Sequence, residues 1–269
     1  MSQPVDLDAY FERIEWGGAI RPGYDTLAGL LGAHMAHIPF ENLEVLLGRP
    51  VRLDLQALQG KLVRARRGGY CFEQATLFAA VLEQLGFVVV RHTARVVLFV
   101  PRHESARTHM FLTVPLAQGT FIIDPGFGSL APRKPVPLAE GAPVQIGHEV
   151  HWMARARNEW VLRTQAGEKT VDCWVSSLEA DNLIDFELAN HYTSTHPLSP
   201  FMNRITMRAL TPNGRVTVMN RDVTIREADA STSSQLADRG ALRTLLAERF
   251  GFDLPEVERL RVPSIPEWS

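Results

Sequence analysis

The spacing of hydrophobic residues changes at Gly86, and this change limits the folds that the chain can adopt. Before Gly86, hydrophobic residues recur every three to four positions, which is typical of one face of an amphipathic helix. Four segments have this spacing, namely residues 6–16, 26–36, 55–66 and 72–85. We therefore expect a compact helical domain over residues 1–86.

After Gly86, the hydrophobic residues form short runs rich in β-branched and aromatic side chains, which favour strands. The predicted strands are residues 87–90, 94–100, 110–114, 121–123, 150–156, 160–164 and 170–175. Polar residues at 101–108 and prolines at 132–143 predict two surface loops. Short strands joined by turns predict an antiparallel β-barrel domain over residues 87–192.

The last third of the chain has both patterns. Residues 181–192 and 240–250 have helical spacing, and a segment with two prolines, 193–203, is expected to be irregular. Pro212-Asn213-Gly214 joins the strand-like runs 205–210 and 216–219, which is a strong hairpin signal. These segments predict an α/β domain over residues 193–269, so the fold class of the whole chain is α+β.

Composition and charge exclude several classes of partner. The 269 residues carry a formal net charge of −2, which provides no overall positive field for nucleic acid. The first eight residues lack the positive and apolar regions of a signal peptide, and no hydrophobic run approaches the roughly 18 residues that span a bilayer. Two cysteines are too few for a disulfide framework. We expect a cytoplasmic protein with free thiols that binds neither nucleic acid nor membrane.

Cys71 is a candidate nucleophile because it opens the predicted helix 72–85 directly after a glycine pair. Unpaired backbone N–H groups and the positive end of the helix dipole stabilise a thiolate there. Gly68 and Gly69 would permit positive φ and a close approach of the backbone. The alternative is a buried cysteine that acts as a small hydrophobic residue.

A thiol nucleophile needs a base and a group that orients the base. His109 opens the apolar run 110–114, and Asp124 ends the run 121–123. If the two runs pair as an antiparallel hairpin around residues 115–120, the two side chains lie close together. The alternatives are a surface histidine and a turn-forming aspartate.

Other polar residues have less specific patterns. His34 and His37 have helical spacing but no second ligand pair, so we expect no metal site. His148 and His151 are expected to be exposed, and Cys173 to have a packing role. Arg67 and Glu41 are expected to form an ion pair that braces the glycine turn.

Five segments in register resemble the arylamine N-acetyltransferase family, which includes bacterial N-hydroxyarylamine O-acetyltransferases. They are residues 38–43 (IPFENL), 67–73 (RGGYCFE), 108–110 (THM), 124–128 (DPGFG) and 194–197 (STHP). The resemblance covers most of the chain up to about residue 203 and is weaker beyond it.

The resemblance implies a helical domain, a β-barrel and an α/β lid, with a core like that of cysteine proteases and transglutaminases. It implies a catalytic triad of Cys71, His109 and Asp124. It also implies acetyl-CoA as co-substrate, with no tightly bound cofactor. The acceptor would be an arylamine, arylhydroxylamine or arylhydrazine, acetylated in a ping-pong cycle through an acetyl-cysteine.

The same resemblance suggests the residues around the triad. An arylamine is flat and apolar, so its pocket should have aromatic walls. Phe40, Phe127 and Phe201 match positions that line such a pocket, and Val96 is a further candidate. Gly68, Gly69 and Gly126 are expected to shape the turns and the oxyanion site.

Two other functions use the same residues. A thiol hydrolase or transglutaminase-like enzyme would use the same triad on amides, and a redox-responsive protein would use Cys71 alone. A homodimer is possible.

Overall fold

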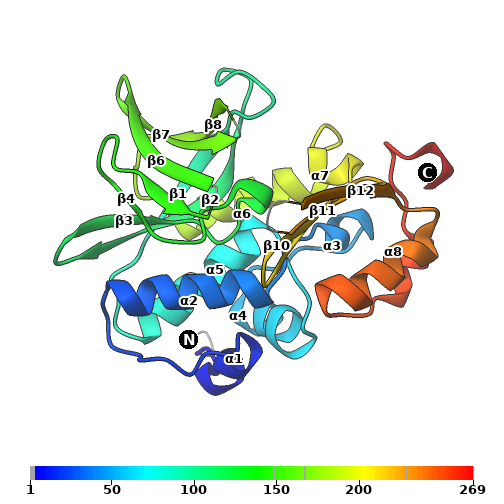
Figure 1. Ribbon diagram of the computed structural model, residues 1–269, viewed down its shortest axis with the longest axis horizontal. Helices are drawn as coiled ribbons and strands as arrows, with labels where there is room; N and C mark the ends of the chain where they lie inside the picture. Colours follow the sequence, from blue (N-terminus) through cyan, green and yellow to red (C-terminus); the bar gives the residue numbers. More distant parts are fainter. Residues whose placement is uncertain (1–3, 148, 167, 228–229, 269) are drawn as a thin grey trace.

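A computed structural model describes residues 4–147, 149–166, 168–227 and 230–268 of the chain. Figure 1 shows three neighbouring parts: helices from the first third, an antiparallel barrel, and a second sheet with the C-terminal helices. Within the described residues, no helix is long and apolar enough to cross a membrane.

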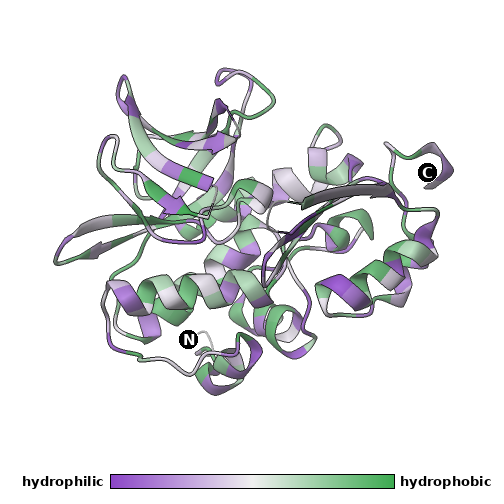
Figure 2. Ribbon diagram, in the orientation of Figure 1, coloured by the Kyte–Doolittle hydropathy of each residue, from purple (hydrophilic) through white to green (hydrophobic). Residues whose placement is uncertain are grey.

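The first part is helical, as predicted. It contains α1 (Leu7–Arg13), α2 (Tyr24–His37), α3 (Leu43–Leu46), α4 (Leu55–Leu58) and α5 (Cys71–Gln84). The predicted helix 55–66 begins as α4 and continues as a π-helix, η1 (Gln59–Arg64). Asp6 and Asp54 cap α1 and α4, since each carboxylate accepts a backbone N–H from the first turn. Helices α2 and α8 carry hydrophobic and hydrophilic residues side by side (Figure 2), as expected for helices buried on one side.

The second part is an eight-stranded antiparallel sheet in the order β4-β3-β2-β1-β8-β7-β6-β5. Its strands are β1 (Val90–Val96), β2 (Arg107–Leu116), β3 (Gly119–Ile123), β4 (Val136–Pro137), β5 (Val144–Ile146), β6 (Glu149–Ala156), β7 (Glu159–Ala166) and β8 (Lys169–Ser176). A bridge between Glu140 and Met153 links the two ends, so the sheet is a nearly closed barrel. The barrel prediction is confirmed.

Some predicted boundaries in the barrel are wrong. The runs predicted at 87–90 and 94–100 are replaced by one strand, β1, which includes the polar pair Arg91-His92 because both residues pair with β2. Residues 87–89 and 97–100 lie outside this strand. The loop predicted at 101–108 ends earlier, since β2 starts at Arg107, and the proline-rich segment contains β4. Side chains that bond across strands override the local polarity that suggested loops.

Strand β2 is buried on both faces, which explains its unbroken apolar run. Met110, Leu112 and Val114 pack against the helices. Phe111 points to the opposite face and belongs to the barrel core. Because successive side chains alternate between faces, His109 points to the same side as Phe111, toward the barrel interior.

The third part contains α6 (Leu183–Thr195), α7 (Pro200–Asn203), a four-stranded sheet, α8 (Arg239–Leu245) and a π-helical continuation, η3 (Leu246–Phe250). The sheet has the order β12-β11-β10-β9, with β9 (Thr206–Thr211), β10 (Gly214–Met219), β11 (Asp222–Glu227) and β12 (Ala230–Gln235). The predicted hairpin is present, since Thr211 pairs with Gly214 across a two-residue turn. Two short helices, η4 (Pro255–Arg259) and η5 (Pro266–Trp268), end the described chain.

Part of this third region was not predicted. Strand β12 is exposed along its length and is made mainly of serine and threonine, so it lacks the alternation that reveals a half-buried strand. Leu43 and Leu46 of α3 belong to the hydrophobic cluster of the C-terminal part. The first and third parts are therefore joined by shared packing.

Candidate active site

Cys71 is the first residue of α5, which packs against β2. This packing brings its Sγ to 3.9 Å from the carbonyl oxygen of Thr108, directly before His109. The residue is 4% exposed. The helix begins at Cys71 because Glu73, in its first turn, accepts the backbone N–H of Tyr70 at 3.1 Å.

The glycine pair before Cys71 allows close backbone contacts. A Cβ on Gly68 would lie 2.2 Å from the carbonyl oxygen of Pro39, and one on Gly69 would lie 2.6 Å from Oε2 of Glu73. The predicted close approach is therefore confirmed. The positive φ that these glycines would permit is not used by either of them, whereas Arg66 has a φ of 52°.

Gly126 packs directly on Cys71 from the other side. A Cβ at Gly126 would lie 2.5 Å from the Cα of Cys71. The turn after β3 therefore reaches the start of α5 only because this residue has no side chain.

His109 and Asp124 form a buried pair. The predicted β2–β3 hairpin is present, with Leu112 opposite Ile123. His109 Nε2 lies 2.9 Å from Asp124 Oδ2, and the two residues are 2% and 0% exposed. Nδ1 is thus the ring nitrogen left for the thiol of Cys71.

The charge state of His109 follows from its neighbours. Burial lowers the pKa of the imidazole, but the charge and hydrogen bond of Asp124 outweigh it, and Cys71 adds a smaller contribution. The resulting pKa is raised to about 10. With this pKa, His109 is an imidazolium at neutral pH, beside the side chain of Cys71.

A β-bulge directs His109 toward this position. The register between β1 and β2 shifts between Ala94 and Arg95, which leaves Thr108 as an extra residue directly before His109. Bulges next to functional sites commonly change the direction in which a side chain points.

A second bulge places Trp174 next to Asp124. The sequence analysis did not predict a role for this residue. The register between β7 and β8 shifts between Leu162 and Arg163, leaving Cys173 as the extra residue. Trp174 Nε1 donates a 2.9 Å hydrogen bond to Asp124 Oδ2, the same oxygen that His109 contacts. No local pattern signals this role, because the bond joins residues 50 positions apart.

The predicted aromatic residues form two groups, one beside His109 and one beside Tyr70, the residue before Cys71. The Phe127 ring meets His109 edge-on, with ring centroids 4.9 Å apart. Phe201 lies 6.1 Å from Phe40 and 5.5 Å from Tyr70, centroid to centroid. Phe40 is buried, whereas Phe127 and Phe201 are half-buried.

Val96, the fourth predicted pocket residue, is less directly connected to the site. It pairs with Trp174 across β1 and β8, so both side chains point to the same face of the sheet. Val96 is half-buried.

Buried charges brace the start of α5. Arg67 donates to Glu41 at 2.7 Å, as predicted, and to Glu44 at 2.6 Å. Lys61 donates to Glu73 at 2.6 Å. Burial, with the charge of Glu41, raises the pKa of Glu73 against the opposing effect of Lys61. These ion pairs stabilise the glycine turn that precedes Cys71.

The two helical histidines have separate partners. His34 is fully buried and shares a 2.8 Å hydrogen bond with the hydroxyl of Tyr10. Burial, with the charge of Arg13, lowers its pKa to about 3. His37 lies 3.4 Å from Glu15. Within the described residues, no group of three potential metal ligands occurs.

The remaining candidates are in the barrel. His151 is fully buried, so its predicted exposure is wrong: its Nε2 bonds the carbonyl of Leu130 at 3.1 Å inside the barrel. His148 lies outside the described residues. Cys173 is fully buried, and burial raises the pKa of its thiol, with a smaller effect of Asp124, which fits a packing role.

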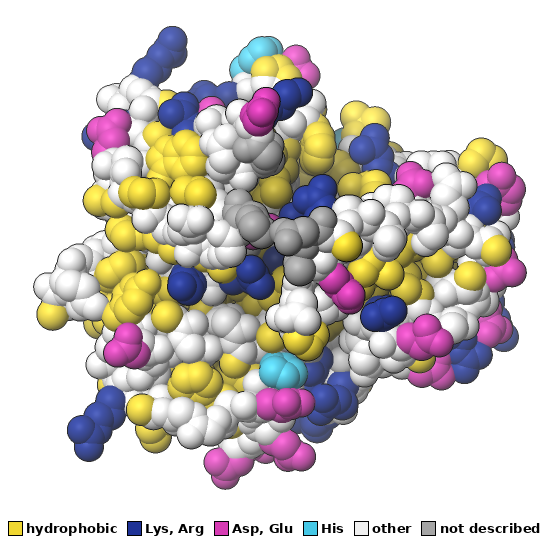
Figure 3. All heavy atoms as spheres, in the orientation of Figure 1, with side chains coloured by type: hydrophobic (Ala, Val, Ile, Leu, Met, Phe, Trp, Pro, Cys, Tyr) yellow, Lys and Arg dark blue, Asp and Glu magenta, His cyan; other side chains and the backbone are white. Residues whose placement is uncertain are grey.

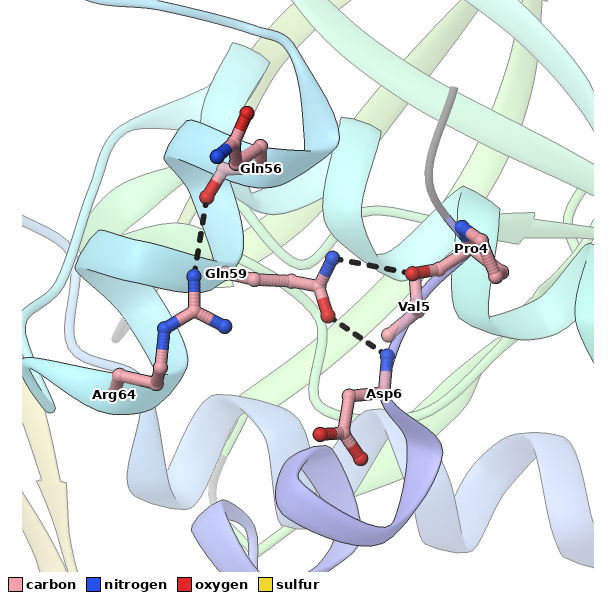
Figure 4. A pocket seen from close by; sticks show the side chains of 6 residues that line it. All are labelled: Pro4, Val5, Asp6, Gln56, Gln59 and Arg64. Atoms are coloured by element: carbon pink, nitrogen blue, oxygen red, sulfur yellow. Dashed lines mark hydrogen bonds between the residues drawn. The ribbon is translucent and has the colours of Figure 1, made fainter. Parts of the chain in front are cut away.

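A cavity of about 530 Å³ lies away from these residues, at the start of the chain. Gln59 connects its walls by bonding the carbonyl of Pro4 and the backbone N–H of Asp6 (Figure 4). Its lining residues are Pro4, Val5, Asp6, Gln56, Gln59 and Arg64. None of the predicted site residues is among them.

Comparison with known proteins identifies the family. Residues 24–259 match a family model described as N-acetyltransferase. The chain is 36% identical over 258 residues to the arylamine N-acetyltransferase of Mycobacterium tuberculosis, and the match covers 94% of this chain and 91% of the relative. The chain belongs to the arylamine N-acetyltransferase family. It is also 33% identical over 254 residues to a Salmonella typhimurium protein named arylamine N-acetyltransferase / N-hydroxyarylamine O-acetyltransferase, covering 94% and 90% of the two chains.

Solved structures of arylamine N-acetyltransferases have the same fold. The M. tuberculosis enzyme matches with a TM-score of 0.89 and 37% identity, over 94% of this chain and 96% of that one. The Mycobacterium marinum enzyme in complex with CoA matches with a TM-score of 0.89 and 33% identity, over 94% of each chain. This family member is therefore an acetyltransferase of mixed α/β fold with a nearly closed barrel.

Proposed function

We propose that this enzyme transfers an acetyl group from acetyl-CoA to the nitrogen of arylamines or arylhydrazines, or to the oxygen of arylhydroxylamines. The reaction is ping-pong and passes through an acetyl-cysteine at Cys71. One observation carries the proposal: His109, bonded to Asp124 at 2.9 Å, is held as an imidazolium beside the Cys71 thiol.

In the first half-reaction, the Cys71 thiolate attacks the carbonyl carbon of acetyl-CoA. The bond between that carbon and the CoA sulfur then breaks, and His109 donates its proton to the departing thiolate. In the second half-reaction, the acceptor nitrogen attacks the acetyl-cysteine, neutral His109 takes its proton, and the Cys71 thiolate leaves. Asp124 keeps the ring oriented and stabilises its charge in both steps.

The tetrahedral intermediates carry a negative oxygen. The backbone N–H of Cys71 would donate to it, because Cys71 is the first residue of α5 and the first N–H groups of a helix have no partner within the helix. A donor of this kind contributes about 3 kcal/mol in comparable sites. Gly126 supports the same region, since its close packing holds the start of α5 against the turn after Asp124.

In this proposal the ring of the acceptor binds near Phe127, which contacts His109, and near Phe40 and Phe201, whose rings are 6.1 Å apart. Val96 contributes from the barrel. In this proposal the chain has a helical domain (1–86), a barrel domain (87–192) and a lid (193–269). The first two form a core like that of cysteine proteases and transglutaminases.

Acetyl-CoA alone tests the proposal. Intact-mass spectrometry of the native protein should show one added acetyl group, which Cys71→Ala abolishes and an arylamine removes. No adduct, combined with hydrolysis or exchange of amides, would favour the thiol-hydrolase or transglutaminase-like alternative. If His109→Gln leaves alkylation of Cys71 by iodoacetamide as fast as before, the thiol acts without the histidine, as a redox sensor would.

A further inference from the structure

Arg107 and His109, two residues apart at the start of β2, lie on opposite faces of the sheet. The ring of His109 stacks on Phe111 in the barrel interior, with centroids 6.5 Å apart. Arg107 points the other way, because its Nε donates to Oγ1 of Thr93, and Thr93 is paired with Met110 on the helix side. Residues two apart on a regular strand share a face, so the β-bulge between Arg107 and His109 is what turns His109 inward.

A largely buried network holds Arg107 in this position. Its Nη2 donates to Oδ1 of Asp181 at 2.6 Å, and its Nε donates to Oγ1 of Thr93 at 2.7 Å. The other carboxylate oxygen of Asp181, Oδ2, accepts the backbone N–H of Thr93 at 2.6 Å and its hydroxyl at 2.9 Å. The side chain of Asp181 is 7% exposed. Hydrogen bonds to ionised groups are stronger than neutral ones, so this carboxylate ties β1 firmly to the first residue of β2.

Asp181 is itself fixed against the barrel. It lies between β8 and α6, and its backbone N–H donates to the carbonyl of Arg91 at 3.2 Å. At the end of β8, Oγ of Ser176 donates to the carbonyl of Thr93 at 2.8 Å. The segment that leaves the barrel is therefore bonded to β1 at two points, and it places its carboxylate beside the bulge.

The loop before the bulge has little packing of its own. Residues 99–104 are exposed. This loop projects from the barrel at the top of Figure 1, and charged side chains cover the same region in Figure 3. Closer to the bulge, Arg95 donates to the carbonyl of Ser105, and the hydroxyl of Ser105 donates to the carbonyl of Val96 at 2.7 Å. Side-chain bonds, more than burial of apolar surface, therefore anchor the start of β2.

We propose that Arg107, Asp181 and Thr93 are positioning residues for the reaction: they fix the bulge and thereby hold His109 at Cys71. This inference rests on the proposed function, in which His109 moves the protons of both half-reactions. The three residues lie on the face of the sheet opposite to His109, so they act through the backbone of β2. A shift of about 1 Å in a reacting group lowers the rate roughly 100-fold.

Asp181→Asn tests the proposal, because an amide has one acceptor oxygen where the carboxylate uses two. Acetylation of Cys71 by saturating acetyl-CoA should slow roughly 10- to 100-fold, measured by intact mass in a single turnover. The KM for acetyl-CoA should stay unchanged, because the network lies on the far face of the sheet. Arg107→Met should have the same effect, and Arg107→Lys, which keeps the charge, should restore part of the rate.

Alkylation of Cys71 by iodoacetamide shows whether the network acts through His109. With His109 present, Asp181→Asn should change the alkylation rate and move its pH profile toward that of His109→Gln. In a chain that already carries His109→Gln, Asp181→Asn should have no further effect, because two changes that act through one group are not additive.

Glu159→Gln is the matched control. Glu159 of β7 pairs with Arg102, which lies five residues before Arg107, and the change again turns a carboxylate into an amide. It should leave the acetylation rate and the pH profile of alkylation at their wild-type values. Thr93→Val removes only a hydroxyl and keeps the shape of the side chain, so it serves as a second variant in case Asp181→Asn does not fold. It should slow acetylation in the same direction, by a smaller factor.

Two results would overturn the inference. The first is an Asp181→Asn or Thr93→Val protein of wild-type melting temperature whose acetylation rate and alkylation profile are those of the wild type. The second is an Asp181→Asn change that alters alkylation by the same factor with and without His109, since the network would then act on the fold as a whole. A wild type that forms no acetyl adduct would instead refute the proposed function, while the alkylation comparison would still measure the link between Asp181 and His109.

Discussion

Replacement of Gly126 by alanine tests how closely the barrel must approach the nucleophile. The added Cβ would lie 2.5 Å from the Cα of Cys71 and 3.2 Å from its Cβ and carbonyl oxygen. Carbon atoms pack best at about 3.5–4.0 Å, so the two backbones must separate by about 1 Å. Overpacking of this kind costs about 1–3 kcal/mol of folding free energy. A shift of about 1 Å in a reacting group lowers the rate roughly 100-fold.

The assay is single-turnover acetylation by acetyl-CoA, followed by intact mass, together with thermal unfolding. Gly126→Ala should acetylate Cys71 roughly 100-fold more slowly than wild type, with a melting temperature lower by a few degrees. Gly32→Ala is the matched control, because Gly32 lies in α2 with no atom within 4 Å of its added Cβ. It should be neutral or stabilise by up to about 1 kcal/mol. A Gly126→Ala protein with wild-type acetylation and an unchanged melting temperature would refute the steric reasoning.

Three further predictions concern the groups around the triad. Trp174→Phe keeps an aromatic ring but removes the N–H that donates to Asp124. Acetylation of Cys71 should therefore slow about tenfold or more. A wild-type acetylation rate and pH profile would contradict the role of that bond. Arg67→Met removes the positive partner of a buried ion pair with Glu41. It should lower the free energy of unfolding, measured in urea, by about 3–5 kcal/mol. An unchanged midpoint of urea unfolding would show that the ion pair is dispensable. Burial lowers the pKa of His109 and Asp124 raises it, to about 10, above the unfolded value of about 6.5. The stabilisation from this proton should therefore be complete below pH ~6.5 and be lost as the pH rises to about 10, so the stability difference between wild type and His109→Gln should shrink over that interval.

The sequence predicted the elements whose stabilising contacts are local. The helices of the first third, the hairpin at Pro212-Asn213-Gly214 and the run of strands between residues 90 and 176 all have signals within a few residues. It failed where packing overrode local polarity. Strand β1 runs through Arg91-His92, and β12 is recognisable only by its pairing with β11. His151 was expected to be exposed, but it is buried in the barrel interior, where its Nε2 bonds a carbonyl from η2 (Gly128–Leu130).

The sequence by itself determined which reactive side chains are available: a thiol at the start of a helix, a histidine at the start of one strand and an aspartate at the end of the neighbouring strand. These follow from short-range order, because a hairpin brings residues only 15 positions apart into contact. Only the tertiary structure decided how these three side chains are oriented and which further residues contact them. The bond from Trp174 to Asp124 and the close packing of Gly126 on Cys71 both depend on segments that meet only when the barrel forms and packs against the helices. A contact between residues 50 or more positions apart leaves no local pattern, since either residue alone is compatible with an ordinary strand.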